Sequence, residues 1–171
     1  MPISMDQVRS LPDFQTAYQW SLSIPNPPTG MDWAPVELRC ISTTTPNRSV
    51  DPMEVTIRGH RVRQAGMATY AGDITLTFVE TVDATVLEFF NAWQDLVWQT
   101  ETGIQAPRAE YMTTVILTML DGRGNPTQKY TLFDVYPNGP IDAGELSGET
   151  GDVVRPSVTL SYTYYRWEKA A

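Results

Sequence analysis

The sequence predicts a mostly β fold, an antiparallel β-barrel or sandwich with one packed α-helix at about residues 84–100. Several short segments alternate apolar and polar residues, as strands do when one face is buried and the other is wet. One segment instead repeats its apolar residues every three to four positions, as an amphipathic helix does. Several strands, one helix and then three more strands favour a sheet structure with the helix packed on it.

The expected strands before the helix are short and bounded by turn residues. Alternation predicts strands at residues 18–24, 36–41, 53–58 and 74–78. The proline-rich segment 25–28 ends the first strand, because proline lacks the N–H that a sheet ladder needs. Gly66 and Gly72 permit sharp changes of direction around the third.

The expected helix has a single apolar stripe. Asp83 is a suitable N-cap and Gly103 a suitable stop. The stripe follows the helical period and predicts a face buried in the core. Its members are Val86, Phe89, Phe90, Trp93, Leu96 and Val97.

After the helix the chain returns to strands. Segments 111–120 and 128–136 flank the turn at 121–126, which predicts a hairpin. The last strand begins at Val158 and alternates with Thr and Ser. We expect a single domain over residues 1–171, with a protruding hairpin arm at about 46–72 and an acidic loop at about 139–156.

Composition restricts the possible functions. The net charge of −8 disfavours tight binding to nucleic acid, which usually needs a basic surface. The N-terminal segment lacks the apolar run of a secretory signal, and no segment has the roughly 20 apolar residues of a membrane helix. Cys40 is the only cysteine, so no internal disulfide forms, and we expect it to be a small buried apolar residue.

Catalytic and metal motifs are largely missing from the sequence. His60 is the single histidine, which excludes a site with several histidine ligands, and one cysteine excludes a zinc cluster. No nucleophile elbow or phosphate loop is found. Asp142, Glu145 and Glu149 are the carboxylates a hydrolase would use, but a solvated acidic loop is the favoured interpretation. We therefore predict a protein that is not an enzyme and that needs no cofactor.

Charge is unevenly distributed along the chain. Residues 48–63 contain four arginines against Asp51 and Glu54, a net charge of +2, so the other residues carry −10. A basic arm on an acidic body favours attraction between the arm of one copy and the body of another. An ordinary exposed hairpin with unrelated arginines is the equally weighted alternative.

The ordered set of motifs resembles the tail tube proteins of contractile-tailed phages, a family related to the tube proteins of contractile injection systems and type VI secretion. The resemblance covers nearly the whole chain, although no single motif is specific. The segments that carry it are residues 14–22, 39–46, 53–70, 72–78, 89–93, 133–137 and 158–165.

This resemblance implies a structural subunit. Six copies would join into a ring, and rings would stack into a hollow tube that conducts double-stranded DNA into a host cell. Implied partners are other copies of the chain, a tail sheath protein outside, baseplate and tail terminator proteins at the ends, and a tape measure protein and DNA transiently in the lumen. Such a tube belongs to a virion assembled in the bacterial cytoplasm.

Three alternatives remain open at this stage. The chain could belong to a protein-injecting particle, or be a paralogue that starts the tube at the baseplate. It could also be a small-ligand-binding β-barrel, such as a lipocalin-like carrier.

Two sets of residues are expected to contribute to assembly. The arm would contact other subunits or rings through Arg48, Met53, Arg58, His60, Arg61, Val62, Arg63 and Met67. The residues expected to face the lumen are Glu54, Thr56, Thr75 and Thr77, while Met53, Val55, Ile57, Ile74, Leu76 and Phe78 would point into the core of the subunit.

Overall fold

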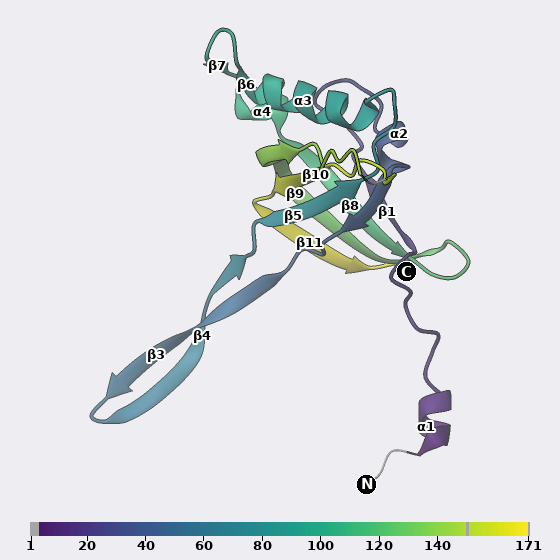
Figure 1. Ribbon diagram of the computed structural model, residues 1–171. Coiled ribbons are helices and arrows are strands. Elements are labelled where there is room, and N and C mark those ends of the chain that lie inside the picture. The colour runs from purple at the N-terminus through teal and green to yellow at the C-terminus, as the bar shows by residue number, and fades with distance from the viewer. Residues whose placement is uncertain (1–3, 150, 171) are drawn as a thin grey trace.

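A computed structural model describes residues 4–149 and 151–170, and its organising element is a long strand, β9 (Pro126–Asp142). The first part of β9 pairs with β8 (Thr113–Leu120) and β11 (Tyr164–Lys169), and its last part pairs with β10 (Ser157–Ser161). The remaining strands of the body sheet are β1 (Trp20–Ser23), β5 (Asp73–Phe78) and β2 (Cys40–Thr43). Figure 1 shows these strands together, with α2 (Ala34–Glu37), α3 (Thr85–Val97) and α4 (Arg108–Tyr111) at one end of the body.

All pairings in the sheet are antiparallel, in the order β1-β8-β9-β10-β5-β2 with β11 beside β9. The predicted mostly β, antiparallel fold is therefore confirmed. The order is an open path from β1 to β2, so the described residues do not form a closed barrel.

Two features extend from the body in Figure 1. One is the hairpin of β3 (Arg48–Ile57) and β4 (His60–Tyr70). The other is an N-terminal arm that carries the short helix α1 (Met5–Arg9). The structure does not describe residues 1–3, 150 and 171. All of them belong to the predicted single domain, and Thr150 also belongs to the predicted acidic loop.

The helix α3 (Thr85–Val97) lies where the apolar stripe predicted it. Its buried residues are Val86, Phe89, Phe90 and Trp93, while Leu96 and Val97 are half-buried. The Trp93 indole donates a hydrogen bond to the main-chain oxygen of Tyr111 at 2.8 Å, which ties the helix to α4 (Arg108–Tyr111). The core beside this helix also contains edge-on aromatic contacts among Trp33, Phe78, Phe89 and Phe90.

The predicted N-cap of α3 was wrong. The cap position is Ala84, in the left-handed region with φ of 54°, and its side chain offers no cap. The Glu80 carboxylate instead accepts hydrogen bonds from the Leu87 N–H at 2.9 Å and the Val86 N–H at 3.3 Å. Asp83 pairs with Arg39 at 3.2 Å, outside the helix. A carboxylate from the preceding turn thus satisfies N–H groups that have no partner within the helix.

Three other predicted boundaries differ from the structure. Residues 34–37 form a helical turn, α2 (Ala34–Glu37), because Pro35 is favoured in a first helical turn. Leu38, which follows this turn, is 88% exposed. Gly103 does not end α3: the helix gives way at Trp98 to a small hairpin of β6 (Trp98–Gln99) and β7 (Ile104–Gln105). The last predicted strand is two strands, β10 and β11. β10 pairs with both β5 and β9, whereas β11 pairs with β9 alone in the described part of the chain.

Cys40 is half-buried, less than the sequence suggested. Burial raises the pKa of its thiol to about 12. None of the helices in the described part of the chain has the length and apolar character needed to span a membrane.

Candidate assembly surfaces

The hairpin β3–β4 has two chemically different faces. Cross-strand partners on the first are Glu54 with Arg63 and Thr56 with Arg61. Val55 and Val62 are partners on the second, where Met53 and Ile57 also lie because strand residues alternate between faces. The turn between the strands places Arg58 at φ of 48° and Gly59 at φ of 84°, the two consecutive left-handed residues typical of a tight hairpin turn.

The polar face of the hairpin is an ion-pair cluster. Glu54 accepts from Arg61 at 2.6 Å and from Arg63 at 2.7 Å, so one carboxylate lies between two guanidinium groups. All three side chains retain contact with solvent. The cluster carries a net charge of about +1, which is part of the net charge of +2 that residues 48–63 carry.

The apolar face of the hairpin has no partner among the described residues of its own subunit. Met53, Val55, Ile57 and Val62 are each about half exposed. The prediction that the first three pack in the core of their own subunit was wrong, because the ribbon stands away from the body beyond its root. Exposed apolar side chains on a projecting ribbon are typical of a surface that another molecule covers.

Other arm residues lie at the root, the bulge and the tip. Arg48 is the partner of Tyr70 at the root, and His60 is the partner of Ile57 at the tip. Met67 is largely exposed. A β-bulge interrupts the register between Val50 and Pro52, and a Cβ atom on Gly66 would lie 2.6 Å from the Asp51 main-chain oxygen. This position therefore requires glycine.

The body presents a hydroxyl-rich face on β5 and β10. Thr77 is the cross-strand partner of Ser157, and Thr75 is the partner of Thr159. Thr75 is exposed and Thr77 is half-buried. On the opposite side of the same strand, Ile74, Leu76 and Phe78 are buried as predicted.

The edges of the body sheet differ in how accessible they are. At β1, the N–H of Leu22 donates to the Glu37 carboxylate and the carbonyl of Leu22 accepts from the Trp33 indole. At β2, a register shift between Cys40 and Ser42 makes the strand irregular. The outer edge of β11 is regular over six residues, and β11 pairs only with β9 within the described part of the chain. A regular unpaired edge is a template for adding another strand.

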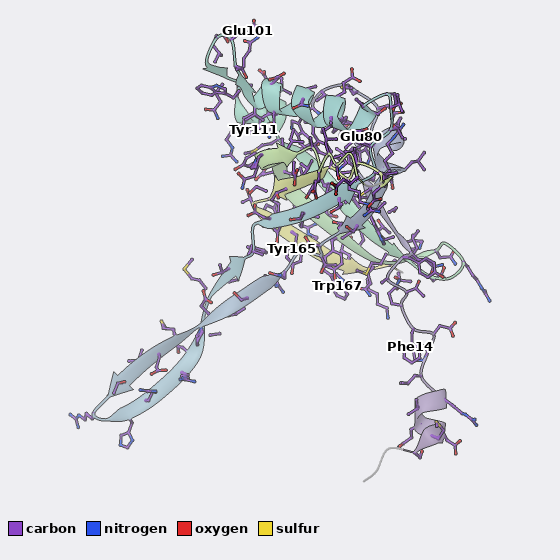
Figure 2. All side chains as sticks on the ribbon, viewed as in Figure 1. Phe14, Glu80, Glu101, Tyr111, Tyr165 and Trp167 are labelled. Carbon is purple, nitrogen blue, oxygen red and sulfur yellow. The ribbon has the colours of Figure 1, made fainter. Side chains whose placement is uncertain are left out.

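The sequence did not single out the groove beside β11. Two arginines and four aromatic residues line it, together with residues at the hairpin root. Figure 2 shows Tyr165 and Trp167 at this edge, between the hairpin root and the N-terminal arm that carries Phe14. The aromatic residues Tyr164, Tyr165 and Trp167 near the end of the chain were the sequence signal for this groove. The prediction of one strand over residues 158–165 did not separate them as a strand of their own.

The carboxylates that a hydrolase would need are not brought together. Asp142 accepts a hydrogen bond from the Gly144 N–H at 3.0 Å within its own turn. Glu145 and Glu149 are exposed. The described residues contain no group of three or more potential metal ligands.

The sequence matches a known protein family over most of its length. The profile described as phage tail tube protein matches residues 12–168. The chain belongs to the phage tail tube protein family. The predicted resemblance is thereby confirmed, and this tube protein is a structural component of a tail tube.

Solved structures show the same fold at low sequence identity. A chain of the anti-feeding prophage baseplate has a TM-score of 0.67 and 15% identity, covering 93% of this chain and 98% of the other. A chain of the sheath–tube complex of an extracellular contractile injection system, named PVC, has a TM-score of 0.67 and 13% identity, covering 99% and 100%. A chain of the anti-feeding prophage tube-terminating cap has a TM-score of 0.71 and 10% identity, covering 94% and 95%. Comparison with curated proteins finds no matching sequence.

Proposed function

We propose that this chain is the main subunit of the inner tube of a contractile tail, in which homohexameric rings stack into a hollow tube. The hairpin β3–β4 carries the proposal, because its exposed apolar face stands away from the body. A two-stranded ribbon alone is marginally stable in water. Docking this face on another copy would bury Met53, Val55, Ile57 and Val62 and order the ribbon.

Ring closure is proposed to use the sheet of the body. A head-to-tail contact between different surfaces of identical subunits gives a closed ring when the rotation closes. The regular free edge of β11 supports such a contact, whereas Glu37 and Trp33 occupy the edge of β1 at Leu22. In this arrangement six copies form a ring around a central channel.

The channel wall is proposed to be polar. Thr75 and Thr77 are its hydroxyl residues on the body, and Glu54 and Thr56 are its residues on the hairpin. This assignment is supported by the burial of Ile74, Leu76 and Phe78 on the other side of β5. Because Glu54 is paired with two arginines, the hairpin part of the wall is mixed in charge, and any repulsion of phosphate would come from the other acids of the chain.

Double-stranded DNA is the proposed cargo, within a virion assembled in a bacterial cytoplasm. The proposed partners are a sheath outside the tube, baseplate and terminator proteins at its ends, and a tape measure protein inside. A protein effector is the second candidate cargo, and the fold shared with a chain of an extracellular contractile injection system favours it. Nuclease treatment and mass spectrometry of purified particles would distinguish DNA from an effector protein.

Sedimentation velocity combined with negative-stain electron microscopy tests the assembly. The expected result is a species near six times the subunit mass of 19.2 kDa, together with annular or tubular particles. A protein that stays monomeric at high concentration and retains a small molecule would instead support a ligand-binding carrier.

A further inference from the structure

The groove beside β11 has a composition that contrasts with the rest of the molecule. It has a volume of about 630 Å³ and runs between the hairpin root and the outer edge of β11. Arg48 and Arg166 line it and no carboxylate does, in a chain of net charge −8. Neither arginine forms an ion pair within the described residues. The groove is thus a positive site whose cations have no acidic partner in the described part of the chain.

An aromatic floor lies on one face of this groove and is formed by Tyr130, Tyr165 and Trp167. Tyr164 and Arg166 line the groove from the other face of β11, because strand residues alternate between faces, and Tyr164 stacks there on Phe133 at a ring separation of 4.6 Å. Tyr165 packs edge-on against Tyr70 at a ring separation of 5.6 Å and against Tyr162 at 6.2 Å, which fixes its position. Tyr164 and Trp167 remain about half exposed. A ligand that fits this site therefore combines negative charge with an apolar side chain.

The free edge of β11 adds main-chain hydrogen bonding to this site. An extended peptide can pair with an exposed strand edge while its side chains enter pockets beside the strand. An extended acidic peptide with one large apolar residue fits all three properties of the groove: the arginines, the aromatic floor and the strand edge.

We infer that this groove binds the acidic loop of a second copy of the chain, through residues 142–149. This loop carries Asp142, Glu145 and Glu149 without any lysine or arginine. It also exposes Leu146 at 85%, the large apolar residue that the aromatic floor requires. Charge complementarity of this kind sets the orientation and register of an interface.

The positions of the loop and the groove in one copy make the contact intermolecular. Hydrogen bonds from the Glu80 N–H to the Val154 oxygen and from the Phe78 N–H to the Pro156 oxygen hold the end of the loop beside the start of α3. Figure 1 shows β11 on the side of the body away from α3. Two different, complementary surfaces on one chain produce a head-to-tail contact that repeats from copy to copy. This inference rests on the proposed tube assembly and assigns it a specific interface.

Charge reversal on each side tests the contact. The groove variant is Arg48→Glu with Arg166→Glu, and the loop variant is Glu145→Arg with Glu149→Arg. Each alone is expected to raise the protein concentration needed for assembly roughly tenfold or more, because two attractive pairs become repulsive. Combining all four substitutions is expected to restore assembly to within about threefold of the wild type, since the pairs are re-formed with opposite signs.

A matched control keeps the net charge change the same. Arg9→Glu with Arg123→Glu reverses two exposed arginines outside the groove and is expected to assemble like the wild type. Circular dichroism checks that each variant is folded. If the groove variant does not fold, the loop variant and Leu146→Ser decide the matter, because their side chains are exposed and lie outside the core.

Three results would overturn the inference while leaving the tube function intact. The first is assembly of both charge-reversed variants at the wild-type concentration. The second is loss of assembly in the four-substitution variant and in the control to the same extent. The third is binding of a short DNA duplex by wild-type subunits that the groove variant abolishes, since the groove would then recognise phosphate. Absence of any assembly by the wild type would instead refute the proposed function itself.

Discussion

The indole nitrogen of Trp33 donates a hydrogen bond to the main-chain oxygen of Leu22 at 2.6 Å, and both residues are buried. The N–H of the same residue, Leu22, donates a hydrogen bond to the Glu37 carboxylate at 3.1 Å. Both side chains come from α2 and its preceding residue, and together they occupy the polar groups of β1 at Leu22. The subunit thus closes one sheet edge with side chains while β11 keeps a regular free edge.

Replacing Trp33 with phenylalanine tests the role of this hydrogen bond in stability. Trp33→Phe keeps an aromatic ring in the core but leaves the Leu22 carbonyl without its donor. The expected loss is about 1–3 kcal/mol in the free energy of unfolding, measured by urea denaturation. Glu37→Gln retains an acceptor oxygen and is expected to cost less than about 1 kcal/mol. Equal stability of the wild type and Trp33→Phe would show that solvent replaces the indole.

Glu80 is expected to be the stabilising cap of α3. Glu80→Ala removes the acceptor of the Leu87 and Val86 N–H groups and should cost about 0.5–2 kcal/mol. Asp83→Ala should have a smaller effect, because the Asp83 carboxylate accepts from the Thr81 hydroxyl and pairs with Arg39 rather than with the N–H groups of Val86 and Leu87. Thermal unfolding of the two variants provides the comparison. A larger loss in Asp83→Ala would contradict the assignment of the cap.

Local periodicity predicted the helices and hairpins that are defined within one segment of the chain. The stripe of α3 and the hairpin of β8 and β9 follow from spacing within one segment. The cap of α3 was missed because Ala84 adopts a left-handed conformation, which moves the capping role back to Glu80. The alternation at residues 36–41 matched a strand by coincidence, since Leu38 is exposed after a helical turn.

The candidate surfaces were predicted less completely, because they depend on contacts between distant segments. The alternation at residues 53–58 was correct, but it did not reveal that the apolar face lacks a core of its own. The groove beside β11 combines Arg48 with residues more than 80 positions later, such as Tyr130 and Arg166. Nothing in local spacing brings these residues together.

Asp134 is expected to tolerate glycine better than a β-branched residue. Its φ is 56°, within a strand whose register shifts opposite Thr113 and Val115. Asp134→Val should cost about 1–3 kcal/mol, because β-branched residues fit the left-handed region poorly. Asp134→Gly should change stability by less than about 1 kcal/mol, since it relieves strain but loses the 3.8 Å contact with Arg108. Chemical denaturation of both variants measures this, and a stable Asp134→Val would contradict it.

The Cys40 thiol is expected to be protected and to make stability pH-dependent at alkaline pH. Burial raises its pKa from 9.0 to about 12, so the folded state holds this proton more tightly than the unfolded state. This contribution is fully present below pH 9 and is lost as pH rises from 9 towards 12. Cys40→Ser should flatten that part of the stability profile. Alkylation of native protein at pH 8 should be much slower than in urea, and equal rates would show an accessible thiol.

The ion-pair cluster of the hairpin is expected to matter for assembly more than for folding. Arg61→Glu with Arg63→Glu places three carboxylates on one face of the ribbon, while the core of the body is unchanged. We expect unfolding of the body to shift by less than about 1 kcal/mol, and the yield of tubes to fall severalfold.

Adding Glu54→Arg to this double variant separates two explanations. The triple variant regains ion pairs within the hairpin but carries a negative cluster. If the arginines contact acids of another copy, tube formation stays impaired. Recovery of tubes would mean that pairing inside the hairpin is the only role of the arginines. Unchanged tubes in the double variant would remove the electrostatic contribution altogether.

Electron cryomicroscopy of the assembled protein is the direct test of the proposed tube. We expect stacked sixfold rings in which the apolar face of the hairpin, represented by Val55 and Val62, is buried against another copy. We also expect Thr75 and Thr77 to face the channel. An assembly in which Val55 and Val62 remain in solvent, or in which Leu76 lines the channel and Thr75 is buried, would contradict the proposed assembly.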